Sequence, residues 1–261
     1  MKLGNGIAAI VTGGSSGLGG AAATALAKAG CKVAIFDVNH EAGESLAKSI
    51  GALFCFCDVT SDASVAEALD RARTANGPER VLVTCAGIAI GQKTVSRDKA
   101  TGEPVAHSLA AFEKVVAVNL VGTFRMVAAA ASSMAALEPL TADGDRGVII
   151  CTASIAAEDG QMGQAAYTAS KGGVAAMTLP IARDLAREGI RVNTILPGLF
   201  NTPMFAGLPE EARRALETTV PFPSRLGDPS EFAALVRHIC ENRMLNGALI
   251  RIDGGLRLAP R

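Results

Sequence analysis

Three side chains in the second half of the chain have the types and the spacing needed to move a proton to or from an alcohol. Tyr167 and Lys171 stand four positions apart, so on a helix they share one face. A free phenol has a pKa of about 10 and is a poor base at neutral pH, but a neighbouring ammonium is expected to lower that pKa toward the working range. Ser154 precedes Tyr167 by thirteen positions. Its hydroxyl is expected to donate to the substrate oxygen as negative charge develops there.

A glycine-rich loop near the start of the chain has a pattern that cradles a dinucleotide. It reads Thr-Gly-Gly-Ser-Ser-Gly-Leu-Gly over residues 12–19 and follows the apolar run 7–11. Gly13 is expected to permit the tight turn, Gly17 to let the backbone approach a pyrophosphate, and Gly19 to let the next helix pack on the sheet. The N-terminus of that helix would face the phosphate charge. Together with the Ser-Tyr-Lys set, the loop predicts hydride transfer.

Two acidic residues bear on which cofactor binds. Asp37 ends the second expected strand, twenty residues after Gly17. A carboxylate there accepts hydrogen bonds from both hydroxyls of the adenosine ribose and repels a 2′-phosphate. No Arg or Lys occupies residues 14–16 or 38–39, where a 2′-phosphate would need its counter-charge, so the sequence predicts NAD rather than NADP. Asp58, which closes the third strand, is expected to face the adenine amino group, with a helix N-cap as the alternative.

Hydrophobic runs of strand length alternate along the chain with longer segments of helical period. The expected strands lie at about residues 7–12, 32–36, 53–57, 80–84, 147–152, 190–195 and 248–252. The expected helices lie at about residues 17–29, 41–50, 61–76, 109–137, 164–188 and 229–242. This alternation predicts a Rossmann-like, doubly wound α/β fold, with a seven-stranded parallel sheet and helices on both faces. One domain is expected over 1–261, with the cofactor half at about 1–150 and the catalytic and substrate half at about 151–261.

The composition excludes several classes of partner. Lys and Arg together number 25, as do Asp and Glu, so no basic excess favours nucleic acid or an anionic membrane. No run approaches the roughly 18 uninterrupted apolar residues of a membrane span, and the first residues lead into a strand rather than a signal peptide. Six cysteines are spread through expected strands and helices, which indicates a reduced chain without a metal site. We therefore expect a small-molecule substrate and a cytoplasmic location.

Two further features surround the expected active site. Asn119 lies in the helix that begins near residue 109 and is expected to bind a water that orients Lys171, with a buried structural role as the alternative. Cys85, Ala86 and Gly87 end the fourth expected strand. Their small side chains would let the backbone approach the cofactor ribose.

The motifs together resemble the short-chain dehydrogenase/reductase superfamily. They are Thr12-Gly13-x-x-x-Gly17-x-Gly19, Asn119, Ser154, Tyr167-x-x-x-Lys171 and Pro197-Gly198. Longer strings resemble the type-2 3-hydroxyacyl-CoA dehydrogenases of that superfamily. They are Cys85-Ala86-Gly87-Ile88-Ala89, Gly163-Gln164-Ala165-Ala166-Tyr167, Thr178-Leu179-Pro180-Ile181-Ala182-Arg183-Asp184-Leu185, Leu196-Pro197-Gly198-Leu199-Phe200 and Val220-Pro221-Phe222-Pro223-Ser224-Arg225-Leu226-Gly227-Asp228-Pro229. The likeness covers essentially the whole chain.

This resemblance implies an NAD-dependent homotetramer that oxidises (S)-3-hydroxyacyl-CoA to 3-oxoacyl-CoA, with activity on some steroid and branched acyl-CoA alcohols. The implied catalytic residues are Ser154, Tyr167, Lys171 and Asn119. The residues expected at the cofactor are Gly13, Ser16, Gly17, Leu18, Gly19, Asp37, Asp58, Val59, Cys85, Ala86, Gly87, Tyr167, Lys171, Pro197, Phe200 and Thr202. Those expected at the substrate are Ser154, Gln161, Tyr167, Phe205 and Leu208. Cys85 replaces the Asn that is common in the wider superfamily but matches this subgroup.

Two connections, from Ile88 to Ser108 and from Gly198 to about Val220, exceed the usual few residues, and long loops at the carboxyl ends of strands tend to be functional. The first holds three basic residues that are expected to meet the phosphates of coenzyme A, or else to be solvated. The second holds large apolar residues that are expected to cover the acyl chain. The basic residues are Lys93, Arg97 and Lys99, and the apolar ones are Phe200, Met204, Phe205 and Leu208.

The expected helix 164–188 carries small residues that would let a helix of another subunit approach closely, although packing within one chain is the alternative. They are Ala165, Ala169, Gly172, Gly173 and Ala176.

Two other functions stand as alternatives. A 3-oxoacyl carrier-protein reductase of the same superfamily would normally use NADPH, and Asp37 argues against it. A catalytically idle scaffold would share the fold without the chemistry. The complete set of Ser154, Tyr167, Lys171 and Asn119 argues against the scaffold.

Overall fold

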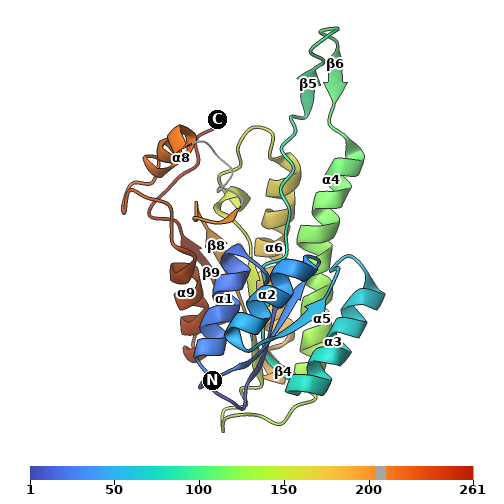
Figure 1. Ribbon diagram of the computed structural model, residues 1–261, viewed down its shortest axis with the longest axis vertical. Helices are drawn as coiled ribbons and strands as arrows, with labels where there is room; N and C mark the ends of the chain where they lie inside the picture. Colours follow the sequence, from blue (N-terminus) through green and yellow to red (C-terminus); the bar gives the residue numbers. More distant parts are fainter. Residues whose placement is uncertain (204–209, 261) are drawn as a thin grey trace.

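A seven-stranded sheet forms the centre of the protein in the computed structural model, which describes residues 1–203 and 210–260 (Figure 1). The strands lie in the order β3-β2-β1-β4-β7-β8-β9, and every neighbouring pair is parallel. They are β1 (Ala8–Thr12), β2 (Lys32–Asp37), β3 (Leu53–Phe56), β4 (Glu79–Thr84), β7 (Gly147–Thr152), β8 (Ile190–Pro197) and β9 (Leu249–Ile252). All seven coincide with the expected runs to within two residues. The predicted doubly wound α/β fold is confirmed.

Helices cover both faces of this sheet. The α-helices in the described part of the chain are α1 (Gly17–Lys28), α2 (His40–Ile50), α3 (Asp62–Asn76), α4 (Leu109–Val116), α5 (Gly122–Ala135), α6 (Ala165–Asp184), α8 (Glu210–Glu217) and α9 (Pro229–Glu241), of which α8 lies beyond the sheet (Figure 1). Side chains of α1, α2 and α9 form the hydrophobic core on one face, and those of α3, α5 and α6 form the core on the other. Along β2, Val33 and Ile35 belong to the first core, whereas Ala34 and Phe36 belong to the second. This is the period of two that a strand between two apolar layers requires.

Side-chain caps fix where several helices begin. Asn39 accepts a hydrogen bond from the Ala42 amide at the start of α2. At α9, Asp228 and Glu231 form a reciprocal capping box, and Pro229 stands at the first helical position, where its missing N–H costs nothing.

The segment predicted as one helix over 109–137 contains an interruption. A π-helical turn, Ala117–Val121, separates α4 from α5, and Asn119 lies in its middle, fully buried. The whole rod from Leu109 to Ala135 is long and apolar enough to cross a membrane by length and composition alone. Here it packs against α6 and β4, with Met126 among its buried residues.

The two long connections contain regular elements that the sequence analysis did not predict. The first forms an antiparallel hairpin of β5 (Val95–Arg97) and β6 (Pro104–Ala106), which projects beyond the rest of the molecule at the N-terminal end of α4 (Figure 1). The second contains α8, whose exposed Glu210 and Arg214 pair one turn apart. Met204, Phe205 and Leu208 lie outside the described residues.

Candidate active site

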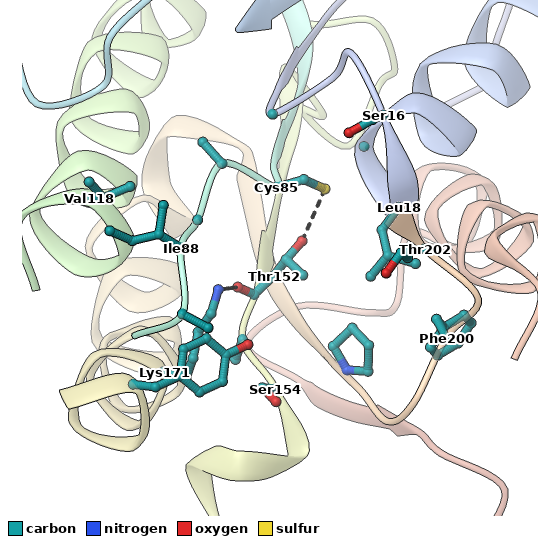
Figure 2. Close-up of a pocket in the computed structure, with 18 of the residues that line it drawn as sticks. Ser16, Leu18, Cys85, Ile88, Val118, Thr152, Ser154, Lys171, Phe200 and Thr202 are labelled. Atoms are coloured by element: carbon teal, nitrogen blue, oxygen red, sulfur yellow. Dashed lines mark hydrogen bonds between the residues drawn. The ribbon is translucent and has the colours of Figure 1, made fainter. Parts of the chain in front are cut away.

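A cavity of about 780 Å³ opens at the carboxyl ends of the central strands. It extends between the segments that follow β1, β4, β7 and β8, which is where the strand order reverses direction. In open α/β sheets, ligands bind at this reversal point. Figure 2 shows Ser154 and Lys171 on one side of the cavity, with Ser16, Leu18 and Thr202 on the other.

The glycine loop folds closely against the segment after β4. Gly13 has a φ of +61°, and a Cβ on it would lie 2.6 Å from the backbone nitrogen of Ala86. A Cβ on Gly19 would lie 2.2 Å from the carbonyl oxygen of Gly13. Neither position can hold a side chain without moving the loop, so both glycines are required for this close packing of the loop that lines the cavity. Gly17 does not itself line the cavity, and a Cβ on it would lie 3.5 Å from the Thr202 side chain.

Asp37 is held at the edge of the cavity between the glycine loop and the turn after β2. Its Oδ2 accepts hydrogen bonds from the Ser15 amide at 3.1 Å and the Ser15 hydroxyl at 2.5 Å. Its Oδ1 accepts from the Asn39 amide at 3.0 Å. Among the described residues that line the cavity, Lys171 is the one cation. The surroundings of Asp37 therefore present a carboxylate and no counter-charge for an extra phosphate.

Asp58 also lines the cavity, and its carboxylate accepts hydrogen bonds from the turn that precedes α3. Its Oδ1 accepts from the amide of Thr60 at 2.9 Å and from its hydroxyl at 2.7 Å. These hydrogen bonds lower the pKa of the Asp58 carboxyl below its ordinary value. The N-cap of α3 is Ser61, which accepts from the Ser64 amide. Asp58 thus shapes the turn without capping the helix, and its Oδ2 accepts no hydrogen bond from the part of the chain that the structure describes.

Tyr167 and Lys171 emerge from the first two turns of α6 and share one face, as their spacing predicts. The Lys171 Nζ lies 5.9 Å from the centroid of the Tyr167 ring. It donates to the carbonyl oxygen of Thr152, the last residue of β7, at 2.8 Å (Figure 2). Ser154 follows two residues later and caps the short 3₁₀ turn Ile155–Ala157, where its Oγ accepts from the Ala156 amide at 3.1 Å.

The protonation of this pair differs from the sequence-based expectation. Burial raises the pKa of the Tyr167 phenol above its ordinary value, and a hydrogen bond with the Ser154 hydroxyl opposes that rise. Burial also lowers the pKa of the Lys171 ammonium, to about 8. The expected lowering of the phenol pKa by Lys171 is therefore wrong for the protein alone. Desolvation of the phenol is the larger effect, and the ammonium is directed at the Thr152 carbonyl.

Asn119 does not line the cavity, but it forms hydrogen bonds with Ile88, which does, and with Ser170, which is next to Lys171. Its Oδ1 accepts from the Ile88 amide at 2.8 Å, and its Nδ2 donates to the Ile88 carbonyl at 2.9 Å and to the Ser170 hydroxyl at 3.0 Å. The side chain thereby ties the segment after β4 to α6. A Cβ on Gly87 would lie 3.2 Å from Asn119 Oδ1 and 3.6 Å from Lys171 Nζ. The amide of Asn119 is thus occupied by protein groups, and its predicted role through a water stays a prediction.

The cavity gathers nearly all the residues singled out in the sequence. Of the predicted catalytic and substrate residues, Ser154, Gln161, Tyr167 and Lys171 line it. So does every predicted cofactor residue except Gly17: Gly13, Ser16, Leu18, Gly19, Asp37, Asp58, Val59, Cys85, Ala86, Gly87, Tyr167, Lys171, Pro197, Phe200 and Thr202. Asn119 lies behind the wall, and Phe205 and Leu208 lie outside the described residues. Their roles in binding remain predictions.

Several lining residues were missed by sequence reasoning. The Thr152 side chain pairs with Cys85, with 3.3 Å between Oγ1 and Sγ, while its carbonyl holds Lys171. Only its place at the end of an expected strand could have drawn attention to it. Gln164, Leu216 and Leu258 also line the cavity. No spacing in the sequence connects the last two with Tyr167.

Comparison with known proteins agrees with this geometry. The family model described as short chain dehydrogenase matches residues 7–213. The chain belongs to the short-chain dehydrogenase family. A 3-hydroxyacyl-CoA dehydrogenase type-2 of Drosophila melanogaster is 52% identical over 253 residues, which cover 96% of this chain and 97% of that protein. A protein of the same name from Homo sapiens is 50% identical over 257 residues, covering 98% and 97%.

A solved structure extends the likeness to three dimensions. The crystal structure of 3-hydroxyacyl-CoA dehydrogenase type-2 from Mycobacterium avium superimposes with a TM-score of 0.93 at 40% identity, and each chain covers 100% of the other. The predicted membership of the short-chain dehydrogenase family is confirmed. As a member of that family the chain is an oxidoreductase that uses a nicotinamide cofactor on a small-molecule substrate.

Proposed function

We propose that this protein is an NAD-dependent dehydrogenase that oxidises (S)-3-hydroxyacyl-CoA to 3-oxoacyl-CoA. The observation that carries the proposal is that one cavity holds Ser154, Tyr167 and Lys171 at one side and the glycine loop with Asp37 at the other. The relatives named 3-hydroxyacyl-CoA dehydrogenase type-2, which are 50–52% identical over nearly the whole chain, support this substrate class. The proposed activity extends to some branched acyl-CoA and steroid alcohols.

The residues of the cavity fit NAD on structural grounds. Gly13 and Gly19 leave a wall without side chains beside the N-terminus of α1, which suits a pyrophosphate. Asp37 stands where a ribose diol would donate to its carboxylate, and no described cation of the lining lies near it. When bound, the nicotinamide ring would accept the hydride.

The protein side chains then handle the substrate oxygen and its proton. Ser154 is placed to donate a hydrogen bond to that oxygen and hold it against Tyr167. Tyr167 takes the hydroxyl proton during oxidation and returns it during reduction. Lys171, anchored on the Thr152 carbonyl beneath the ring, supplies positive charge to the phenolate that forms.

The direct test is turnover by the purified full-length chain. NADH should form from (S)-3-hydroxybutyryl-CoA but not from the (R) enantiomer, and NADP should be a much poorer oxidant than NAD. The rival 3-oxoacyl carrier-protein reductase would instead prefer NADPH and a carrier-bound substrate. Absence of turnover with every 3-hydroxyacyl-CoA, in a protein that still binds NADH, would overturn the proposal.

The cofactor preference makes a separate prediction for Asp37. Asp37→Ala removes the ribose acceptor and the repulsion of a 2′-phosphate, so the ratio of kcat/KM for NAD to that for NADP should fall by about 10²-fold. Asp62→Ala, at an exposed position on α3, serves as the control and should keep the wild-type ratio. A wild-type enzyme that already prefers NADP would contradict the assignment of Asp37.

The three basic residues of the first long connection lie at different distances along the hairpin from the segment that carries Gln161. At the base of the hairpin, next to Lys93, the Gln92 amide donates to the Gly163 carbonyl at 2.9 Å. Arg97 donates to the Gly102 carbonyl within the hairpin, and Lys99 stands in its exposed turn. Lys93 is therefore the one placed beside the segment that carries Gln161.

If the trio recognises the phosphates of coenzyme A, Lys93 should account for most of the effect. Lys93→Gln should raise KM for acyl-CoA about fivefold, with little change in kcat and none in KM for an alcohol without CoA. Lys99→Gln is the matched control. Equal changes in KM for both kinds of substrate would reject phosphate recognition and leave the trio as a solvated loop.

A homotetramer is also proposed, and one exposed face supports it. Small or apolar residues recur along the outer side of α6 at Ala165, Ala169, Gly172, Ala176 and Leu179. Phe124, on α5, is a further exposed apolar side chain. Gly173, by contrast, serves packing within the chain, since a Cβ there would lie 2.7 Å from Leu120. Light scattering should give about four times the chain mass of 26.6 kDa, and a monomer would reject the proposal.

A cytoplasmic location is proposed because all six cysteines are unpaired, five of them buried, as suits a reducing compartment.

A further inference from the structure

The last residues of the chain form part of the cavity that holds Tyr167. After β9 the backbone turns at Gly254 and Gly255, both at positive φ, and runs back toward α8 without regular structure (Figure 1). We call residues 253–260 the C-terminal tail. Leu258 of this tail lines the cavity together with Gln161 and with Leu216 of α8. These residues lie outside the glycine loop and the Asp37 region, so they face the part of the cavity left for substrate.

The tail packs directly on the segment between Ser154 and Tyr167. Leu256 is 2% exposed and forms a small apolar cluster with Ile155, the neighbour of Ser154, and Val220. Leu258 is partly buried against that cluster. Farther along, the Gln161 Nε2 donates to the Ala259 carbonyl at 2.9 Å. The Met162 amide donates to the Pro260 carbonyl at 3.1 Å. A short stretch of backbone without a helix or strand of its own is thus fixed at several points.

Arg251, near the end of β9, joins these pieces. Its Nη2 donates to Asp159 Oδ2 at 2.9 Å and to the Leu256 carbonyl at 3.0 Å, and its Nε donates to Asp253 Oδ2 at 2.8 Å. It also pairs with Glu158. The Arg251 side chain is only 17% exposed, so these contacts are poorly screened by water. One guanidinium therefore links the sheet, the segment after Ser154 and the tail, with its donors distributed over four partners.

Arg257 provides an internal comparison. Its Nη1 lies 3.6 Å from Asp159 Oδ2 and 3.8 Å from Asp253 Oδ2, but its side chain is 65% exposed. Arg257 thus pairs with the same two carboxylates from the solvent-exposed side. Within the described residues it donates no hydrogen bond to the tail backbone. Exposed pairs of this kind contribute little.

We propose that the C-terminal tail is a wall of the acyl-binding part of the site, that Leu258 sets the length of acyl chain accepted, and that Arg251 is the positioning residue that holds this wall. The inference rests on the proposed function, because it concerns which acyl-CoA is preferred. A leucine side chain in the wall of a cavity limits the space beside it. Adding or removing a few methyl groups there changes the selectivity between neighbouring homologues by about tenfold or more.

The test measures the ratio of kcat/KM for a long substrate, (S)-3-hydroxydecanoyl-CoA, to that for a short one, (S)-3-hydroxybutyryl-CoA. Leu258→Ala should raise this ratio about tenfold, and Leu258→Phe should lower it, with KM for NAD unchanged in both. Leu140→Ala, on the loop before the amino end of β7, is the control and should keep the wild-type ratio. Because Leu258 lies outside every strand and helix, both variants are expected to fold, which NADH binding checks.

Arg251→Met removes the guanidinium at similar length and should change the ratio in the same direction as Leu258→Ala, with partial rescue in Arg251→Lys. Arg257→Gln should have no effect. In the double variant Arg251→Met with Leu258→Ala, the change in ratio should equal that of one single variant, because both disable the same wall. If the change in the double variant were instead the product of the changes in the two single variants, Arg251 would act independently of Leu258. That result would overturn the positioning role of Arg251.

The outcomes separate the two proposals. A wild-type enzyme that oxidises neither substrate would overturn the proposed function and this inference with it. An active wild type whose ratio stays unchanged in both Leu258 variants, each still binding NADH normally, would overturn the inference alone.

Discussion

Tyr167→Phe should abolish turnover while NAD binding stays largely intact. The ring remains in place beside Lys171, and only the oxygen that exchanges the proton is lost. General acid–base catalysis contributes typically 10²–10⁴-fold, so kcat for (S)-3-hydroxybutyryl-CoA should fall by about 10³-fold or more, which is roughly 4 kcal/mol of barrier. The measurements are steady-state oxidation and the dissociation constant of NADH. A variant that keeps more than a small residue of activity would show that another group moves the proton.

The chain offers an independent readout for this residue. Tyr167 is the one tyrosine of the sequence, and there is no tryptophan, so the ultraviolet absorbance of a phenolate reports Tyr167 alone. Burial raises the pKa of this phenol. A pH titration of the protein without cofactor should therefore show phenolate forming only above the ordinary range for tyrosine. Ser154→Ala should move the transition to still higher pH, because the hydrogen bond that opposes the rise is lost. A midpoint below the ordinary value would contradict this account.

Lys171→Met should cost both catalysis and cofactor affinity. The ammonium is expected to support the Tyr167 phenolate and to hydrogen-bond the nicotinamide ribose, so kcat should fall about 10²-fold or more and the dissociation constant of NAD should rise severalfold. Lys48→Met, in the last turn of α2, is a control for the loss of one positive charge. An unchanged affinity for NAD would confine Lys171 to a single role.

The same substitution makes a prediction about stability. Burial lowers the pKa of Lys171 to about 8 in the folded protein, whereas an unfolded lysine has a pKa of about 10.4. Between these values the unfolded chain binds more protons, so this group makes the free energy of unfolding rise with pH across that window, by on the order of 3 kcal/mol. Denaturant unfolding between pH 7.5 and pH 10, on the wild type and Lys171→Met, checks it. The variant should lack this rise. If the free energy of unfolding changed with pH in the same way in both proteins, the lowered pKa of Lys171 would be contradicted.

Most of the scaffold was predictable because its apolar runs have an unambiguous length and order. β1, β4, β7 and β8 lie between two layers of helices, and such strands must be apolar on both faces. The glycine loop could be placed on the same grounds, since it directly follows one of these runs. The carboxyl ends of parallel strands share one edge of the sheet. Ser154, Asp37 and Cys85 could therefore be assigned to one site before the structure was known.

What could not be predicted has physical reasons as well. The strands β5 and β6 are three residues each and exposed, so no apolar run marks them. The π-helical turn at Asn119 changes the backbone hydrogen bonding without changing the apolar period of the helix. The pKa of Tyr167 depends on how deeply the ring is buried, which the spacing of Tyr167 and Lys171 does not show. The contribution of Leu258 depends on where the tail returns, and Arg251 determines that through contacts distant in sequence.

The hydrogen bonds of Asn119 have a mechanical consequence. Its side chain joins the backbone of Ile88, which follows β4, the central strand of the sheet, to Ser170 of the helix that carries Tyr167 and Lys171. The Asn119 side chain is fully buried, and its bond to Ser170 is buried while the two to Ile88 are part-buried. The segment after β4 and the helix that carries the proton-transfer pair are therefore expected to move together. A displacement of the Ile88 segment should then reach Tyr167 and Lys171 as well, and a displacement of α6 should reach Ile88.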